Sequence, residues 1–270
     1  MILTDILMLL ATGLLAGFAG GLFGIGGGVI IVPALYAVFS AHGVDDDVRI
    51  KLAIGTSLAT IIVTSIRSVQ AHTKAGNVDW LLLKSWALWI AIGAVGGSVI
   101  ARIAAPTALT LFFGLGLMVL GGQRLLARRK DIDPSASLPA RAWQRIMATL
   151  TGVASSLLGI GGGVIGVLIL TRAGRTVHRA VGTAAGFGLA IAAPGALGYM
   201  IMGLGADVPP WSLGFVSLPA FAAVATGTAL AAPWGARTAT RLSAVTLSLI
   251  FGSYVVITGA LMIRSALTGG

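Results

Sequence analysis

The chain has 270 residues, of which 57% are hydrophobic and only 10% are charged, and its mean hydropathy is +0.99. A soluble domain carries about 25% charged residues, so this composition predicts a protein that crosses the membrane several times. The sequence has no cysteine and no glutamate, and its formal charge is +10. These counts exclude a disulfide scaffold, a cysteine-ligated metal site and catalysis by paired glutamates.

Apolar stretches follow one another along nearly the whole chain. Helices are the expected form, because every backbone amide in lipid must be paired within its own segment. A full crossing needs about 20 residues, which some of the stretches have and others lack. The stretches lie at 3–22, 28–40, 50–70, 80–101, 106–127, 143–158, 163–171, 180–203, 212–234 and 241–264.

The second half of the chain repeats landmarks of the first half. The sequence GIGGGVI at 24–30 returns letter for letter at 159–165, an offset of 159 − 24 = 135. Two further landmarks recur in the same order, 53–56 at 180–183 and 101–102 at 236–237. We therefore predict a first transmembrane repeat over 1–127, a polar cytoplasmic linker over 128–142 and a second transmembrane repeat over 143–270.

The distribution of Lys and Arg distinguishes two ways of threading the membrane. If each GIGGG segment joins two halves of one broken crossing, there are eight crossings and the 18 basic residues divide ten to eight. If each is a re-entrant hairpin, six crossings remain and the division is fourteen to four. The positive-inside rule favours the second threading, in which the outer side holds only Arg49, Lys51, Arg102 and Arg264. Three crossings per repeat would make the halves inverted, a recurrent transporter plan.

The two GIGGG segments are the main candidates for a binding site. Four glycines in five positions favour a broken helix, and the helices that start near Val29 and Val164 would point their positive ends at the breaks. Two such ends near the middle of the membrane would suit an anion. Close helix packing through small residues is the structural alternative. A dinucleotide-binding loop does not fit, because no strand precedes either segment.

Hydroxyl groups follow the glycine motifs in both halves. Gly55-Thr56-Ser57 is matched by Gly182-Thr183 in the second half. Such hydroxyls could donate to an oxyanion without carrying charge, and they could equally bond a neighbouring helix.

Other chemistries find little support in the sequence. No carboxylate lies deep within an apolar stretch, so we expect no proton or sodium coupling through a buried acid. The histidines His42, His72 and His178 lie apart, so we expect no metal site, no other cofactor and no enzymatic activity. The basic residues fall in short gaps between apolar runs rather than in a patch, so nucleic acid is not an expected partner.

Together these motifs resemble the TauE/SafE sulfite exporter family of bacterial membrane proteins. The matching sequences are GFAGGLFGIGGG at 17–28, VPAL at 32–35, AIGTS at 53–57, GNVDW at 76–80, GIGGG at 159–163 and AVGT at 180–183. The resemblance implies a multi-pass inner-membrane transporter with duplicated halves, seven or eight transmembrane segments, and sulfite, sulfonates such as sulfoacetate, or related anions as substrates. The six crossings favoured by the charge count depart from that description. The second copy also has Leu168 in place of Pro33 and Ala184 in place of Ser57.

The sequence thus predicts an all-α polytopic protein of two inverted repeats that exports a small sulfur-containing anion by alternating access. A passive anion channel of the same architecture, or an importer of a related organic anion, is the alternative function. The predicted substrate contacts are Gly24, Gly26, Gly27, Gly28, Thr56, Ser57, Gly159, Gly161, Gly162, Gly163 and Thr183.

Overall fold

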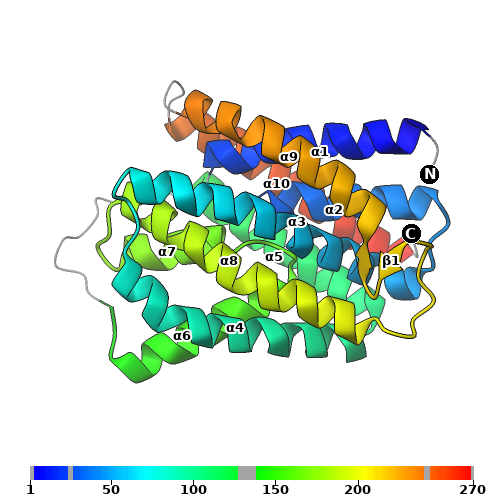
Figure 1. Cartoon of the computed structure of the whole chain (residues 1–270), viewed down its shortest axis with the longest axis horizontal. Helices are drawn as coiled ribbons and strands as arrows, with labels where there is room; N and C mark the ends of the chain where they lie inside the picture. The colour runs from blue at the N-terminus through cyan, green and yellow to red at the C-terminus, as the bar shows by residue number, and fades with distance from the viewer. Residues whose placement is uncertain (1–2, 24–26, 127–137, 240–243, 269–270) are drawn as a thin grey trace.

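The computed structural model of the chain describes residues 3–23, 27–126, 138–239 and 244–268 (Figure 1). Within these ranges the chain forms ten α-helices and one short antiparallel β-hairpin. The elements are α1 (Leu3–Phe23), α2 (Gly28–Ala41), α3 (Asp46–Lys74), α4 (Trp80–Ile103), α5 (Pro106–Leu126), α6 (Arg141–Leu157), α7 (Gly163–Arg172), α8 (Val177–Met202), β1 (Ser212–Leu213), β2 (Val216–Ser217), α9 (Leu218–Ala239) and α10 (Ala244–Thr268).

Helix length and hydropathy confirm that this is an all-helical, polytopic membrane protein. Among the described helices, five are long and apolar enough to cross a bilayer: α1, α3, α4, α5 and α8. The helices that begin at the last glycine of each GIGGG segment are shorter, with 14 residues in α2 and 10 in α7. At 1.5 Å per residue neither reaches the roughly 30 Å of a hydrocarbon core. Their starts at Gly28 and Gly163 lie next to the predicted starts at Val29 and Val164.

Two contacts between oppositely charged side chains identify which helix ends lie together at each end of the molecule. Asp5 near the start of α1 lies 2.9 Å from His42, which follows α2, so the chain returns to the end that it left. At the opposite end, Arg175 between α7 and α8 lies 3.5 Å from Asp79 between α3 and α4. We refer to these as the His42 end and the Asp79 end; they lie at the right and the left of Figure 1.

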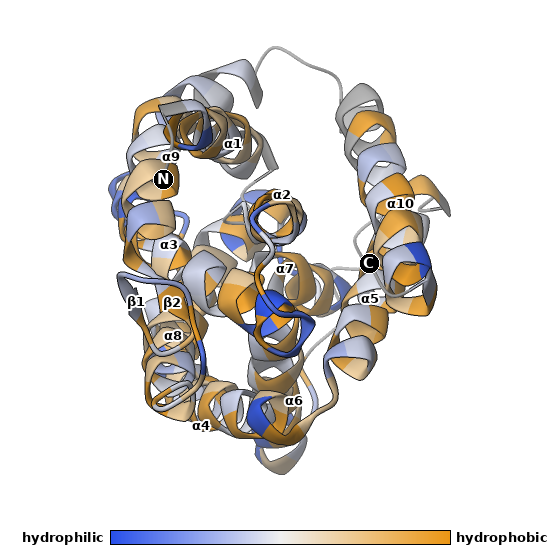
Figure 2. Cartoon of the chain, turned by 90° about the vertical axis from the view of Figure 1, so that its right-hand side faces the viewer, coloured by the Kyte–Doolittle hydropathy of each residue, from blue (hydrophilic) through white to orange (hydrophobic). Residues whose placement is uncertain are grey.

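The long helices pack in pairs, and α3 packs along α8. Helix α1 packs along α9, α4 along α6, and α5 along α10, while α2 and α7 pack against α3 and α8 respectively. Figure 2, a view onto the His42 end, shows α2 and α7 near the middle and the longer pairs around them. In the core, the rings of Trp86 on α4 and Phe187 on α8 stack with centroids 5.4 Å apart. Large apolar side chains such as Leu81 and Leu115 remain exposed on the outer helices, as expected of a surface that faces lipid.

The predicted linker falls mostly outside the described residues. Of 128–142, only 138–142 are described, and α6 begins at Arg141, two residues before the predicted second repeat. The β-hairpin at 212–217 was not expected from the sequence. Its turn places Gly214 at φ 54°, and a Cβ there would overlap with the carbonyl oxygen of Met200, so glycine allows the hairpin to lie against α8.

Candidate functional site

Helix α3 carries an unusual number of buried polar side chains through the middle of the protein. Thr56, Ser57 and Thr60 are fully buried, and Ser65 is 4% exposed. A buried hydroxyl is costly unless it is hydrogen-bonded. The partners of these side chains therefore show what each position does.

Gly55 and Thr56 on α3 hold the segment that leads into α9. A Cβ at position 55 would overlap with the carbonyl oxygen of Phe215, so glycine is required for this approach. Two residues after Phe215, the backbone N–H of Ser217 donates a hydrogen bond to Thr56 Oγ1 at 3.0 Å. The glycine and the threonine thus act together to dock the start of α9 on α3.

Gly182 and Thr183 on α8 hold the segment that leads into α4 in the same way. A Cβ at position 182 would overlap with the carbonyl oxygen of Asn77. Two residues after Asn77, the backbone N–H of Asp79 donates a hydrogen bond to Thr183 Oγ1 at 2.9 Å. The recurrence of the Gly-Thr pair in the sequence therefore corresponds to a recurrent docking contact, with each half holding a helix start of the other. Contact of Thr56 and Thr183 with a substrate stays a prediction.

The two GIGGG segments meet at the centre of the molecule. Ser57 Oγ donates a hydrogen bond to the carbonyl oxygen of Gly159 at 2.8 Å. A Cβ at Gly28 would overlap with that same carbonyl oxygen, so only hydrogen at this position allows α2 to approach the end of α6. The structure thus brings together three of the predicted residues, Gly28, Ser57 and Gly159.

The other described glycines of the two motifs lead into the two short helices or line a cavity. Gly27 precedes α2 with φ 78°, a left-handed conformation that favours glycine, and Gly162 precedes α7. Gly161 and Gly163 border a cavity that is lined by residues from both halves of the chain. Gly24 and Gly26 lie outside the described residues.

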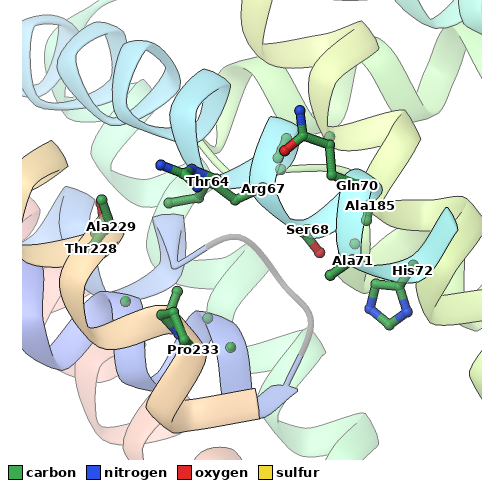
Figure 3. A pocket seen from close by; sticks show the side chains of 18 of the residues that line it. Thr64, Arg67, Ser68, Gln70, Ala71, His72, Ala185, Thr228, Ala229 and Pro233 are labelled. Atoms are coloured by element: carbon green, nitrogen blue, oxygen red, sulfur yellow. The ribbon is translucent and has the colours of Figure 1, made fainter. Parts of the chain in front are cut away.

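That cavity has a volume of about 440 Å³ and lies among α1, α3, α7, α8 and α9 (Figure 3). Its buried part contains the hydroxyls of Ser65 and Thr228 beside Gly161 and Gly188. Twelve of its 21 lining residues are alanine or glycine, so the space results from missing side chains rather than from separated helices. It reaches the surface toward the Asp79 end, where Arg67, Gln70 and Lys74 are exposed.

The charges around the cavity all have the same sign. Arg67 and Lys74 on α3 line it together with His72, and Figure 3 shows Ser68 and His72 directed from α3 toward α1 and α9. No Asp or Glu is among the described lining residues. A concave site lined by one sign of charge with low-dielectric walls concentrates ions of the opposite sign. The cavity is therefore suited to a small anion.

Sequence reasoning found only part of this cavity. Gly161 and Gly163 line it, whereas Thr56, Ser57 and Thr183 do not. The lining residues that it missed as site residues include Ser65, Arg67, Ser68 and Thr228. Ser57, Ser65 and Ser68 are spaced so that they share one face of a helix, and this spacing could have indicated a polar face on α3. The alanines and glycines of the wall have no such signature.

The described residues do not suggest a metal centre. No group of three or more His, Cys, Asp or Glu side chains within the described ranges could hold a metal ion. The groups of the cavity lining that can bind an anion are hydroxyls, backbone amides and basic side chains.

Comparison with known proteins identifies the family. The model of the family described as "Sulfite exporter TauE/SafE" matches residues 9–262, nearly the whole chain. The chain belongs to the TauE/SafE family. The resemblance found in the sequence motifs is thereby confirmed, and the chain is a membrane transporter by family.

The chain is also similar to transporter proteins of several organisms. A "Probable membrane transporter protein" of Haemophilus influenzae is 34% identical over 256 residues, which cover 94% of this chain and 96% of the relative. One from Methanocaldococcus jannaschii is 29% identical over 214 residues, 78% of each chain. One from Xylella fastidiosa is 33% identical over 170 residues, 61% of this chain and 62% of the relative. No solved structure matches the chain significantly.

Proposed function

We propose that this TauE/SafE protein exports small sulfur-containing oxyanions, such as sulfite and sulfonates, across the inner membrane by alternating access. The anion would enter the cavity at the Asp79 end and leave at the His42 end. The observation that carries the proposal is the cavity of about 440 Å³, which has Arg67, His72 and Lys74 in its lining and no acidic residue among the described ones.

The distribution of charge supports the direction. Basic residues gather at the Asp79 end, on the last turns of α3 and around the α7–α8 turn, whereas few lie at the His42 end. By the positive-inside rule, this distribution supports a cytoplasmic Asp79 end. An interior-negative potential contributes about 2.3 kcal/mol per charge per 100 mV toward expulsion of an anion. Export therefore needs no buried acid to couple it to another ion.

Reciprocal contacts support two inverted repeats. The packing of α1 on α9 has its counterpart in the packing of α6 on α4, and α5 pairs with α10. The Gly-Thr pair of α3 likewise holds the segment at Ser217, just before α9, and the Gly-Thr pair of α8 holds the segment at Asp79, just before α4. Such exchanged contacts are expected when a two-fold axis in the membrane plane relates the halves.

Closure of the path favours a carrier over a passive channel. Every residue of α3 from Lys51 to Ile61 is buried, so the cavity at the Asp79 end does not continue along this helix to the His42 end. We propose that the anion rests against the backbone of the GIGGG segments, with Gly161 and Gly163 nearest the cavity. Transport would then require the contact of Gly28 and Ser57 with Gly159 to open.

The experiment that tests this function is flux of sulfite and a panel of sulfonates in reconstituted vesicles. Wild-type protein should show saturable uptake and counterflow, which a channel does not give. Arg67→Met should raise KM about tenfold or more, since a hydrogen bond to a charged group contributes about 1.5–3 kcal/mol. Lys84→Met is the matched control, because Lys84 is exposed on α4 outside the cavity lining. Wild-type flux equal to that of protein-free vesicles for every anion would refute the proposal.

A further inference from the structure

A second pocket lies at the His42 end, opposite the cavity. It has a volume of about 500 Å³ and is bordered by the start of α3, the end of α4 and the segment around Asp207 and Phe215. Its lining differs from that of the cavity because it carries charges of both signs. The charged members are Lys51, Arg102, Asp45, Asp47 and Asp207.

Lys51 is the buried member of this set. The residue is 9% exposed, and its Nζ donates to the carbonyl oxygen of Arg102 at 3.2 Å and lies 5.9 Å from the centre of the Phe215 ring. Among the described residues, no carboxylate comes within salt-bridge distance of Nζ. A buried ammonium that has a carbonyl and a ring but no ion partner retains capacity for an anion.

Arg102 and Asp45 are already engaged in holding helix ends. The guanidinium of Arg102 donates to the carbonyl oxygen of Met202 at the end of α8. Asp45 precedes α3, and its side chain accepts a hydrogen bond from the backbone N–H of Asp47 at 2.8 Å. This leaves Lys51 as the cation of the pocket best placed to meet a ligand.

Helix α3 thus carries cations at both openings, Lys51 at the His42 end and Arg67 with Lys74 at the Asp79 end. Lys51 and Arg67 are 16 residues apart, which is about 24 Å along a helix. The surroundings of the two cations differ. Arg67 shares its cavity with His72 and Lys74 and with no described aspartate, whereas Lys51 shares its pocket with Arg102 and three aspartates. Like charges near a bound anion weaken its binding, so the same oxyanion should be held more weakly at the His42 end.

We propose that the pocket at the His42 end is a low-affinity release site for the transported oxyanion. Lys51 contacts the anion there, and Asp45, Asp47 and Asp207 keep its affinity low. The site would receive the anion when the central contact opens and would discourage its return. This inference rests on the proposed function, because it assigns the exit of the same transport path.

The test compares KM for sulfite on the two sides, measured in sealed right-side-out and inside-out membrane vesicles. The wild-type KM should be about tenfold higher, or more, from the His42 side than from the Asp79 side, the size of effect that a few charge contacts produce. Lys51→Met should raise KM from the His42 side further, and Lys51→Arg should largely restore it. Asp47→Asn with Asp207→Asn should lower KM from the same side. Arg264→Met is the control, since Arg264 is exposed and lies outside the pocket lining.

The outcomes separate this inference from the proposed function. Absence of wild-type flux from either side would refute the proposed function itself. Normal wild-type flux with equal KM on both sides, or an unchanged KM from the His42 side in both Lys51→Met and the double aspartate variant, would overturn the release site alone. The double aspartate variant provides this test even if Lys51→Met does not fold, because both aspartates are exposed.

Discussion

Thr183 on α8 accepts a hydrogen bond from the backbone N–H of Asp79 at 2.9 Å, across 104 residues of sequence. The contact fixes the start of α4, where the Asp79 side chain in turn accepts from the backbone N–H of Leu82 at 3.1 Å. Thr56 makes the equivalent contact with Ser217 before α9. The two threonines thus tie together segments that belong to different halves of the chain.

These contacts predict that removing either hydroxyl destabilises the protein. Thr56→Val and Thr183→Val each leave a backbone N–H without its acceptor, which costs about 1–3 kcal/mol. Thermal unfolding in detergent should show both variants less stable than wild type, with Thr56→Ser and Thr183→Ser close to it. The two predicted roles can be told apart in the same preparations. A Val variant of unchanged stability that has lost sulfite flux would place the hydroxyl at the substrate instead.

Substitution of Gly55 and Gly182, which precede these threonines, should also destabilise the protein. In Gly55→Ala and Gly182→Ala the added methyl group meets the carbonyl oxygen of Phe215 or Asn77, so the docked segment must move away. Overpacking of this kind costs about 1–3 kcal/mol or more. Gly96→Ala on α4 and Gly122→Ala on α5 are matched controls, because a Cβ at either position meets nothing within 4 Å.

Thermal unfolding of the four variants in one detergent would check this. Alanine favours a helix over glycine by roughly 1 kcal/mol, so the two controls should be as stable as wild type or more stable. If the variants at 55 and 182 matched the controls, the close approach of the two segments would be contradicted.

The sequence was informative where the physics is local. Hydropathy and length indicated helices, and the glycine runs predicted the starts of α2 and α7 to within one residue. The recurrence of Thr56 at Thr183 identified a shared role but could not distinguish a substrate contact from a docking contact, because the partners Ser217 and Asp79 are remote in the sequence. The cavity was harder to find. Five helices contribute to it, α1, α3, α7, α8 and α9, and more than half of its lining residues are alanines and glycines, whose effect depends on which helices face one another.

The size of the cavity leads to a prediction about selectivity. Ala185 on α8 is buried in the cavity lining, and Ala229 on α9 lies across from it in Figure 3. Ala185→Leu and Ala229→Leu should narrow the cavity and reduce transport of the larger sulfonates more than transport of sulfite. Uptake of a series of sulfonates of increasing length, relative to sulfite, measures this. Ala222→Leu, exposed on α9 outside the lining, should leave the series unchanged.

An equal loss of all substrates in the two cavity variants, at normal protein levels, would argue against that prediction. It would indicate that the anion does not rest in this space and that the substitutions act on the movement of α8 or α9. The control at position 222 shows whether an added leucine on α9 is itself harmful.

The ion pair at the His42 end predicts a dependence of stability on pH. The pKa of His42 is raised above its ordinary value of 6.5 because its ring donates to the carbonyl oxygen of Val38 and contacts the Asp5 carboxylate. A raised folded-state pKa means that the protonated histidine stabilises the folded protein. This contribution is fully present below pH 6.5 and is lost as the pH rises through the raised pKa of the folded state.

Thermal unfolding measured from about pH 5 to about pH 9, which brackets the usual histidine pKa of about 6.5, should therefore show the stability of the wild type relative to His42→Gln falling as the pH rises. His42→Gln is the reference because glutamine keeps a hydrogen-bond donor but does not titrate. A His42→Gln profile that parallels the wild type would mean that another group titrates. The contact of α1 with the segment after α2 would then hold independently of the charge on His42.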